Sequence, residues 1–289
     1  MIAPGDDVLA RVPGAADGPF EVAALRGGLT NRSFLVGTAL GRFVVRLGTG
    51  ADALLGIDRH TEAAAQRLAA TVAVAPRVID ADESRGLLIT EYVAGRAWEQ
   101  SDFATPGQID RLGSQLARLH ALDAHASAGL PVRDPLTAAH AYVARIVQEA
   151  PGERAALTRL LGQAADAHLA SGAGARPATL VHSDLHGSNI VDGEGLWLID
   201  WEYAALADPL QDVASVLAYH PDAAAHAGRL LDAVGLGDVT RRDLLAAVWM
   251  FQLLVFLWYR VRRLAVAPTS ADLAAERRAH AALVHNGNL

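Results

Sequence analysis

Cysteine and lysine are both absent from this sequence of 289 residues. Without cysteine there can be no disulfide, no thiolate metal ligand and no cysteine nucleophile, which fits a reducing compartment. Without lysine, all 25 cationic side chains are arginines, so any side-chain anchor for a phosphate must be a guanidinium. The composition alone therefore excludes cysteine chemistry and lysine as a phosphate anchor.

Clusters of basic residues are also missing. The formal net charge is −7, and no run of arginines offers the concentrated positive surface that a nucleic-acid backbone requires. We therefore expect no nucleic acid partner. Residues 1–19 carry acids and prolines where a secretory signal would have a basic and then an apolar segment, so we expect a cytoplasmic protein.

One apolar stretch, Leu244 to Tyr259, is broken only by Gln252 and has arginines near both ends. At about 1.5 Å per residue this stretch would reach about 24 Å, short of a hydrocarbon layer of about 30 Å. Hydrophobic residues make up 52% of the chain, enough for a large core. The stretch therefore predicts a buried helix and no membrane span.

The chain divides into two parts with different sequence patterns. Short apolar or β-branched runs separated by turns indicate strands at 20–26, 33–38, 42–47, 77–80 and 87–93, with one helix at 59–71 that Asp58 caps. After Gly95, helices rich in alanine and leucine follow, the first with Thr105 and Pro106 as its cap and first residue. We expect an α+β fold with a small antiparallel-sheet lobe over residues 1–93 and a larger, mostly helical lobe over residues 94–289.

A polar loop between two short apolar runs interrupts the helices, in the segment LVHSDLHGSNIVDGEGLWLID from Leu180 to Asp200. Asp184 and Asn189 lie on this loop, and Asp200 ends the second apolar run. Phosphoryl transfer needs a carboxylate that orients or deprotonates the acceptor hydroxyl, and oxygen ligands for the Mg²⁺ that bridges the nucleotide phosphates. We assign the first role to Asp184 as catalytic residue and the second to Asn189 and Asp200 as metal ligands.

The segments HSDLHGSNI and LIDWEYA resemble the catalytic and metal-binding segments of the choline/ethanolamine kinase family, within the aminoglycoside phosphotransferase superfamily. Upstream, GGLTN, SFLV, RFVVRLGTG and IDR with Glu62 resemble its bacterial choline kinase branch. The resemblance implies a two-lobed, protein-kinase-like fold. It also implies an ATP-dependent kinase that moves the γ-phosphate to the hydroxyl of a small cationic alcohol, most simply choline or ethanolamine.

The same resemblance implies residues of a nucleotide site. A turn over the phosphates, where backbone amides approach the anion, would be formed by Gly27, Gly28, Thr30 and Asn31. Arg46 would stand where protein kinases carry a phosphate-binding lysine, with Glu62 on the following helix as its ionic partner. The backbone from Glu91 to Val93 would hydrogen-bond the adenine, and Asp212 would brace the catalytic loop.

The sequence identifies the residues of the acceptor pocket less clearly. The resemblance implies a cage for a trimethylammonium group built partly by tryptophans near the C-terminus, here Trp249 and Trp258, and one aromatic face attracts such a cation by about 0.5–2 kcal/mol. Glu202 and Asp208 would add negative potential. The two tryptophans are nine residues apart, about 180° around an ideal helix, so both can hardly face one pocket, and a core position is the alternative for either.

Other functions stay open at this point. An aminoglycoside or thiamine is the alternative acceptor. His182, Asp184 and His186 alternate and could hold zinc in a metal-dependent hydrolase, although such a site would leave Asn189 and Asp200 without a use. A non-catalytic kinase-like protein would be expected to lack part of the catalytic set, whereas this sequence retains Asp184, Asn189 and Asp200.

Overall fold

The computed structural model describes residues 3–25, 28–123 and 129–286. The chain forms two compact units. The first comprises Met1–Ala97 and Ile190–Glu202, and the second comprises Trp98–Asn189 and Tyr203–Leu289. The first unit thus takes in the segment Ile190–Glu202, which the sequence-based boundary between residues 93 and 94 assigned to the helical lobe.

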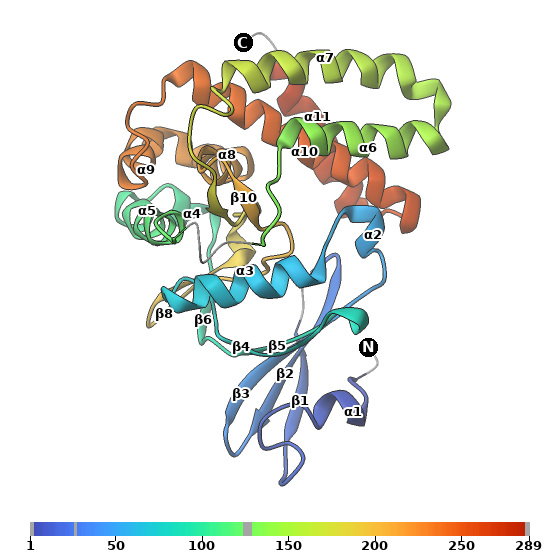
Figure 1. The fold of residues 1–289 in the computed structure, drawn as a ribbon, viewed down its shortest axis with the longest axis vertical. Helices are drawn as coiled ribbons and strands as arrows, with labels where there is room; N and C mark the ends of the chain where they lie inside the picture. The colour runs from blue at the N-terminus through green and yellow to red at the C-terminus, as the bar shows by residue number, and fades with distance from the viewer. Residues whose placement is uncertain (1–2, 26–27, 124–128, 287–289) are drawn as a thin grey trace. The chain divides into compact units, whose positions relative to one another are not determined.

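A five-stranded antiparallel sheet forms the centre of the first unit (Figure 1), with the strand order β1-β2-β3-β5-β4. Its strands are β1 (Glu21–Leu25), β2 (Asn31–Thr38), β3 (Gly41–Gly48), β4 (Val78–Asp82) and β5 (Leu87–Glu91). Each predicted strand is present, with ends that differ by at most two residues; β5, for example, ends at Glu91 and not at Val93. Apolar or β-branched runs and flanking glycines therefore predicted the sheet well.

The two faces of this sheet bury different side chains. One face packs against α1 (Asp6–Leu9) and the turn after it, in an apolar core that includes Val8, Val12, Phe34, Phe43, Val45 and Ile89. The other face carries Arg46, whose guanidinium pairs with Glu62 of α3. Because alternate residues of a strand point to opposite faces, the sheet separates an apolar layer from an ionic one.

Helix α3 (Arg59–Thr71) has the bounds that the sequence predicts and follows the short α2 (Asp52–Leu55). Its N-cap is Asp58, whose side chain accepts hydrogen bonds from the backbone N–H of His60 at 2.9 Å and of Thr61 at 3.4 Å. Such a cap satisfies amide groups that have no partner within the first turn. The helix therefore starts at a defined residue, which places Arg59 and Glu62 on its first turn.

A second sheet, of order β6-β8-β9, joins the segment Ile190–Glu202 to the first unit. Its strands are β6 (Gly95–Ala97), β8 (Ile190–Gly193) and β9 (Leu196–Leu198). The pair β6–β8 is close: a Cβ on Gly95 would lie 2.4 Å from the carbonyl oxygen of Asp192. The N–H of Leu198 donates to the carbonyl of Val74 at 2.8 Å. These contacts fix Asp200, just after β9, within the first unit.

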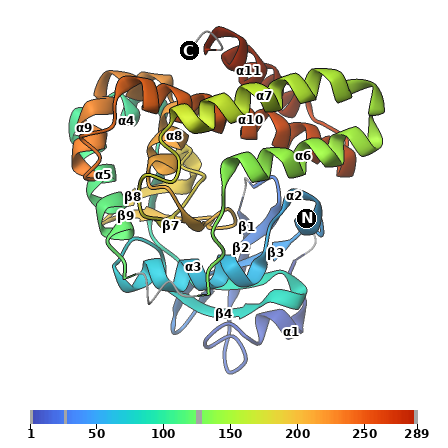
Figure 2. The ribbon, with the colours of Figure 1, turned by 45° about the horizontal axis from the view of Figure 1, so that its top comes forward.

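Helices make up most of the second unit (Figure 2). They are α4 (Gln100–Phe103), α5 (Pro106–His120), α6 (Pro135–Glu149), α7 (Arg154–Ala170), α8 (Leu210–Tyr219), α9 (Ala227–Ala233), α10 (Arg241–Ala265) and α11 (Ser270–Asn286). Helices α6 and α7 form a hairpin, and both contact α10. A two-stranded antiparallel sheet pairs β7 (Thr179–Val181), which leads into the polar loop, with β10 (Ala205–Ala207).

Helix α10 is long and apolar enough to cross a membrane by length and composition alone. In this fold, however, 56% of its most apolar window is buried, and it contacts α6, α7, α8 and α11. Ion pairs join its last turns to α11, with Arg262 and Asp272 2.7 Å apart. Packing against four helices accounts for the apolar stretch, as expected for a buried helix.

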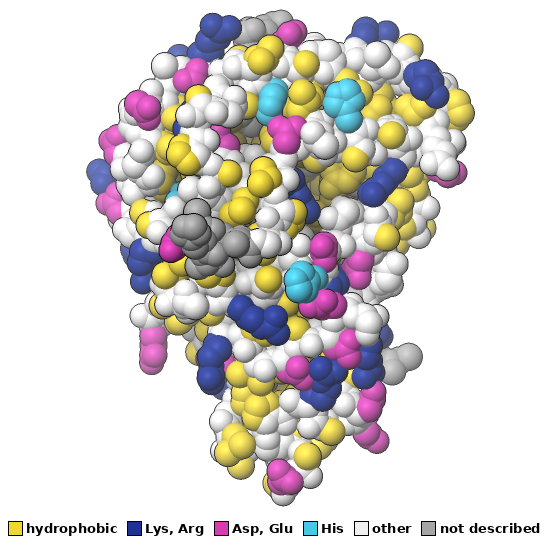
Figure 3. Space-filling model, viewed as in Figure 1, with side chains coloured by type: hydrophobic (Ala, Val, Ile, Leu, Met, Phe, Trp, Pro, Cys, Tyr) yellow, Lys and Arg dark blue, Asp and Glu magenta, His cyan; other side chains and the backbone are white. Residues whose placement is uncertain are grey.

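Arginine and carboxylate side chains are interspersed on the face of the molecule shown in Figure 3. Several guanidinium groups are paired: Arg11 lies 2.6 Å from Asp80, and Arg176 lies 2.7 Å from Asp208. The pairing neutralises Asp208, which sequence reasoning had placed near a cationic acceptor. Interspersed and paired charges do not build the positive surface that nucleic acid binding requires, and the expected lack of a nucleic acid partner stays a prediction.

Candidate active site

The loop after β7 is held by Asp212 of α8, which is fully buried. Its Oδ1 accepts hydrogen bonds from the backbone N–H of His182 at 3.0 Å and of Ser183 at 2.8 Å, and its Oδ2 lies 2.9 Å from Nε2 of His120. Ser183 has a φ of 64°, a left-handed conformation that costs a non-glycine residue about 1–3 kcal/mol. The charge-assisted bonds of Asp212 offset this cost, so the residue has the bracing position that the sequence suggests.

The carboxylate of Asp184 is contacted from three sides. The hydroxyl of Tyr219 donates to Oδ1 at 2.8 Å, Nδ2 of Asn189 donates to Oδ2 at 3.1 Å, and Nε2 of His186 lies 3.5 Å from Oδ2. Burial disfavours the ionised carboxyl, but His186 and the hydroxyl of Tyr219 outweigh burial and hold the pKa of Asp184 below its usual range. The group is therefore ionised and oriented, as a base for a hydroxyl must be.

Asn189 is only 4% exposed, and its Nδ2 donates a second hydrogen bond, to the backbone oxygen of Asp184, at 2.9 Å. Within the described part of the chain, its Oδ1 receives no hydrogen bond. The amide nitrogen thus holds the carboxylate of Asp184, while the amide oxygen remains for another partner. An amide oxygen is a ligand that Mg²⁺ accepts.

Sequence reasoning missed Tyr219. Burial, followed by the charge of Asp184, raises the pKa of Tyr219 well above its usual value, so the phenol stays protonated and donates to the carboxylate. The rings of His186 and Phe251 meet it edge-on, with centroids 5.5 and 5.4 Å away. Tyr219 follows Asp212 by seven residues on α8, a spacing that returns to the same face of a helix. That spacing is the signal that could have identified it.

Three more aromatic side chains accompany Tyr219 in the second unit. Tyr259 and Tyr203 both contribute to the raised pKa of Tyr219, after burial and Asp184. The indole N–H of Trp258 donates to the hydroxyl of Tyr203 at 2.5 Å, and its ring meets that of Tyr259 edge-on at 5.0 Å. We call these residues the aromatic cluster: Tyr203, Tyr219, Trp258 and Tyr259.

Trp249 lies in a different environment on the same helix. It is 3% exposed, and its indole N–H donates to the carbonyl of Leu283 on α11 at 3.2 Å. This is the core position that the nine-residue spacing from Trp258 left open. Trp249 and Trp258 therefore have separate partners, as their nine-residue spacing predicts.

Arg46 connects three segments of the first unit. From β3, its guanidinium pairs with Glu62 of α3 and with Asp200 after β9. Burial lowers the pKa of Arg46 and the carboxylates of Asp200 and Glu202 oppose this effect, while a guanidinium remains charged in either case. The Arg46–Glu62 pair that the sequence suggests is present, and the contact with Asp200 adds a second acid.

Asp200 has a backbone φ of 66°, again in the left-handed region. Carboxylate oxygens of Glu62, Asp200 and Glu202 lie within 4.8 Å of one another. The side chain of Asp200 is 25% exposed, against 2% for Glu62 and 5% for Glu202. Carboxylate oxygens are the hard ligands that Mg²⁺ accepts, and Asp200 is the most exposed of the three.

Glu202 lies against the turn that precedes β2. Its Oε1 accepts from the hydroxyl of Thr30 at 2.9 Å and its Oε2 accepts from Nδ2 of Asn31 at 2.9 Å. Burial, and after it the charge of Asp200, raise the pKa of Glu202 to about 7. Sequence reasoning placed Glu202 at the acceptor, whereas the structure places its carboxylate on the turn.

The glycine turn contains one residue, Gly28, whose backbone has a left-handed conformation. Gly28 has a φ of 85°, and a Cβ there would lie 3.1 Å from the carbonyl oxygen of Asn31. Any other residue would be strained at this φ. Gly27, the other glycine of the predicted turn, lies outside the described residues.

Glu91 and Val93 lie where the chain leaves the sheet after β5. The N–H of Glu91 donates to the carbonyl of Arg77 at 2.9 Å, and the carboxylate of Glu91 pairs with the guanidinium of Arg77 at 2.5 Å. Among described residues, the N–H of Val93 donates to no backbone acceptor. The N–H of Val93 therefore remains for a planar base, whereas the N–H of Glu91 is engaged within the sheet.

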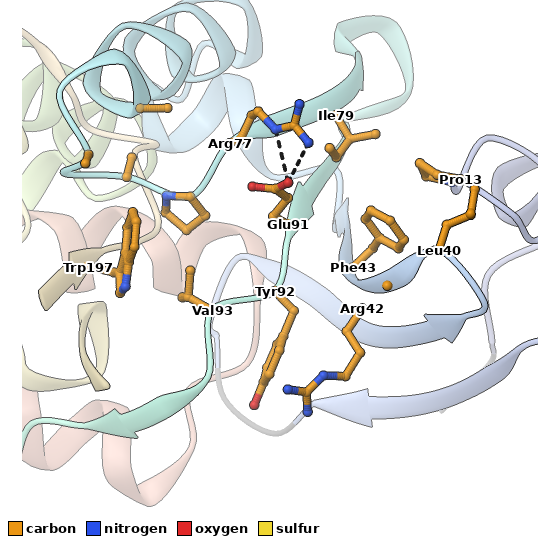
Figure 4. A pocket seen from close by; sticks show the side chains of 15 residues that line it. Pro13, Leu40, Arg42, Phe43, Arg77, Ile79, Glu91, Tyr92, Val93 and Trp197 are labelled. Atoms are coloured by element: carbon orange, nitrogen blue, oxygen red, sulfur yellow. Dashed lines mark hydrogen bonds and ion pairs between the residues drawn. The ribbon is translucent and has the colours of Figure 1, made fainter. Parts of the chain in front are cut away.

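A cavity of about 610 Å³ opens beside this segment in the first unit. Figure 4 shows Phe43, Tyr92 and Trp197 around it, with the Arg77–Glu91 pair at its edge. Phe43 is paired with Glu91 across β3 and β5. The lining includes both Arg42 and Phe43, which are neighbours on β3 and point to opposite faces, and it does not include Arg46.

Comparison with known families decides the class of protein. Residues 21–245 match the family described as Phosphotransferase enzyme family. The chain belongs to this family. A comparison of this phosphotransferase with proteins of curated function found no match.

Solved structures resemble this phosphotransferase over most of its length. A choline/ethanolamine kinase family protein from Mesorhizobium loti is 26% identical, with a TM-score of 0.72 over 98% of this chain and 92% of that chain. Choline kinase LicA from Streptococcus pneumoniae is 18% identical, with a TM-score of 0.70 over 91% and 94%. Macrolide 2′-phosphotransferase MphH from Brachybacterium faecium is 25% identical, with a TM-score of 0.61 over 89% and 91%.

These findings confirm two predictions. The α+β, protein-kinase-like fold is the fold of the similar structures. The phosphotransferase is an enzyme whose family and structural neighbours are kinases that act on small molecules. Which small molecule it phosphorylates is a separate question, to which the geometry around Asp184 is the guide.

Proposed function

We propose that this phosphotransferase moves the γ-phosphate of MgATP to the hydroxyl of a small cationic alcohol, with choline and ethanolamine as first candidates. The observation that carries this proposal is the aromatic cluster, whose Tyr219 is bonded to the ionised carboxylate of Asp184. An aromatic face attracts an ammonium group by about 0.5–2 kcal/mol, and more where water is excluded. A carboxylate hydrogen-bonded to an aromatic side chain, with further aromatic residues in the same unit, therefore suits an alcohol that carries a positive charge.

The chain's own residues have distinct roles in the proposed reaction. The acceptor oxygen forms a bond to the γ-phosphorus while the bond from that phosphorus to the bridging oxygen of ADP breaks, and the hydroxyl proton passes to Asp184. Tyr219 and Asn189 orient that carboxylate. Arg46 offsets negative charge on the phosphates, beside the backbone amides of the glycine turn. Asn189 and Asp200 would hold Mg²⁺, which would further neutralise the phosphate oxygens.

Adenine nucleotides are supported by two similar proteins. One structure is of LicA in complex with AMP, and another is of a spectinomycin phosphotransferase in complex with ADP and spectinomycin. For this chain we infer that the backbone of Glu91 and Val93 meets the adenine edge. Backbone recognition of this kind leaves side chains free to vary.

The test is magnesium- and ATP-dependent release of ADP across a panel of choline, ethanolamine, thiamine, an aminoglycoside and a macrolide. The proposal expects saturable turnover with choline or ethanolamine, and none with these acceptors when EDTA replaces Mg²⁺. Turnover confined to the aminoglycoside or the macrolide would refute the cationic alcohol and assign the site to a larger acceptor. Turnover with thiamine alone would keep a cationic alcohol and replace the named candidates.

A further inference from the structure

Arg59, the first residue of α3, is a buried cation that the proposed reaction does not use. Its side chain is 8% exposed. Its Nη1 lies 2.9 Å from Glu62 and 3.6 Å from Glu202. Its Nη2 donates to Oδ1 of Asn31 at 2.8 Å and to Asp52 at 2.5 Å. One guanidinium therefore joins α3, the segment after β9, the start of β2 and α2.

The amide of Asn31 is held at both of its polar atoms. Arg59 donates to its Oδ1, and its Nδ2 donates to Oε2 of Glu202 at 2.9 Å. Thr30, the preceding residue, donates to the same carboxylate. Because both hydrogen-bonding atoms of the amide are engaged in a buried network, the side chain has one orientation, and the backbone that follows Gly28 is fixed with it.

We propose that Arg59 is a positioning residue of the nucleotide site, which holds the turn from Gly28 to Asn31 in the conformation that receives the phosphates. The inference rests on the proposed function, because it takes this turn to cover the phosphates of ATP. A turn that is ordered before the nucleotide arrives loses less conformational freedom on binding. Arg59 is itself enclosed by protein groups, so its effect on the nucleotide passes through Asn31 and Glu202.

An arginine suits this position better than any other cation. Its planar fork presents two Nη atoms, each shared here between two acceptors. A lysine would preserve the charge but has a single nitrogen, which cannot reach all four groups at once. Arg59→Lys therefore separates the contribution of charge from that of geometry.

Direct titration of MgADP tests the inference without reference to the acceptor. The proteins are the full chain, Arg59→Gln, Arg59→Lys and, as matched control, Arg67→Gln, which alters an exposed arginine of the same helix. We expect MgADP to bind about tenfold more weakly to Arg59→Gln, the order of effect for losing a charge-assisted hydrogen bond. Arg59→Lys should lie between, and the control and the KM for the acceptor should each stay within about twofold of the wild type.

The route through Asn31 is tested by a double variant. If Arg59 acts by holding Asn31, then Arg59→Gln with Asn31→Ala should bind MgADP about as weakly as the weaker single variant, because both changes remove one linkage. If the two single losses of MgADP affinity multiply in the double variant, Arg59 does not act through Asn31. A general loss of folded protein would not produce this pattern, because it lowers the fraction of active protein and leaves the affinity for MgADP unchanged.

Two results would overturn the inference. One is wild-type affinity for MgADP in Arg59→Gln that is folded by its melting temperature. If Arg59→Gln does not fold, Arg59→Lys decides, and wild-type affinity there has the same meaning. Failure of the proposed function looks different, because the unaltered protein itself would then bind no MgADP, and the inference would fall with it.

Discussion

Replacement of Asp184 by asparagine keeps the shape of the side chain and exchanges one carboxylate oxygen for an amide nitrogen. Two donors point at this carboxylate, the hydroxyl of Tyr219 at 2.8 Å from Oδ1 and Nδ2 of Asn189 at 3.1 Å from Oδ2. Asparagine has one acceptor oxygen, so one of these donors must face an NH₂ group. A buried donor left without its acceptor costs about 1–3 kcal/mol, and we expect a corresponding loss of stability.

The chemical effect should exceed the structural one. Asp184→Asn cannot take the proton of the acceptor hydroxyl, and loss of a general base lowers kcat by about 10²- to 10⁴-fold. Affinity for MgADP should change little, because the altered group serves the acceptor. The assays are ADP release under saturating substrates, MgADP titration and thermal unfolding.

The matched control is Asp222→Asn, which makes the same exchange at an exposed aspartate of the same unit. Its side chain accepts one hydrogen bond, from Gln100 at 3.0 Å, so kcat and the melting temperature should both stay close to wild type. A folded Asp184→Asn enzyme whose kcat stays within about tenfold of wild type would refute Asp184 as the base.

Three further predictions concern the metal, the acceptor and pH. Asp200→Ala should weaken ADP binding about tenfold or more with Mg²⁺ present and little in EDTA, because it removes a hard oxygen ligand; an equal loss in EDTA would contradict a metal role. Tyr219→Phe should lower kcat by about tenfold, through loss of one bond to an ionised carboxylate, with KM for MgATP unchanged; a selective rise in that KM would place Tyr219 elsewhere. The ring of His220 stacks on that of Phe103, with centroids 3.5 Å apart. Burial lowers the pKa of His220 to about 4. The unfolded chain binds this proton near its ordinary pKa of about 6.5, so stability falls as pH drops from about 6.5 towards 4; His220→Gln should flatten the fall in melting temperature over that range, and an unchanged slope would contradict the assignment.

Local sequence predicted much of the first unit, because its signals act over a few residues. Apolar or β-branched runs between turns predicted the strands of the sheet, and Asp58 predicted the start of α3. The pairing of Gly95 with Gly193 had no such signal, because strands far apart in the chain meet through tertiary packing. That pairing places Asp200 in the first unit, a result that no local pattern around Asp200 could show.

By itself the sequence determined which chemistry is available. It excluded thiolates and lysine, supplied the acids and the amide of the polar loop, and placed two glycines before β2. Only the tertiary structure decided which partner each group has. Thr30 meets Glu202 across 172 residues, and two tryptophans of one helix have unlike surroundings, Trp249 in the core and Trp258 beside Tyr203. The physical reason is that residue type and spacing set what a side chain can bond, whereas its partner depends on how distant elements pack.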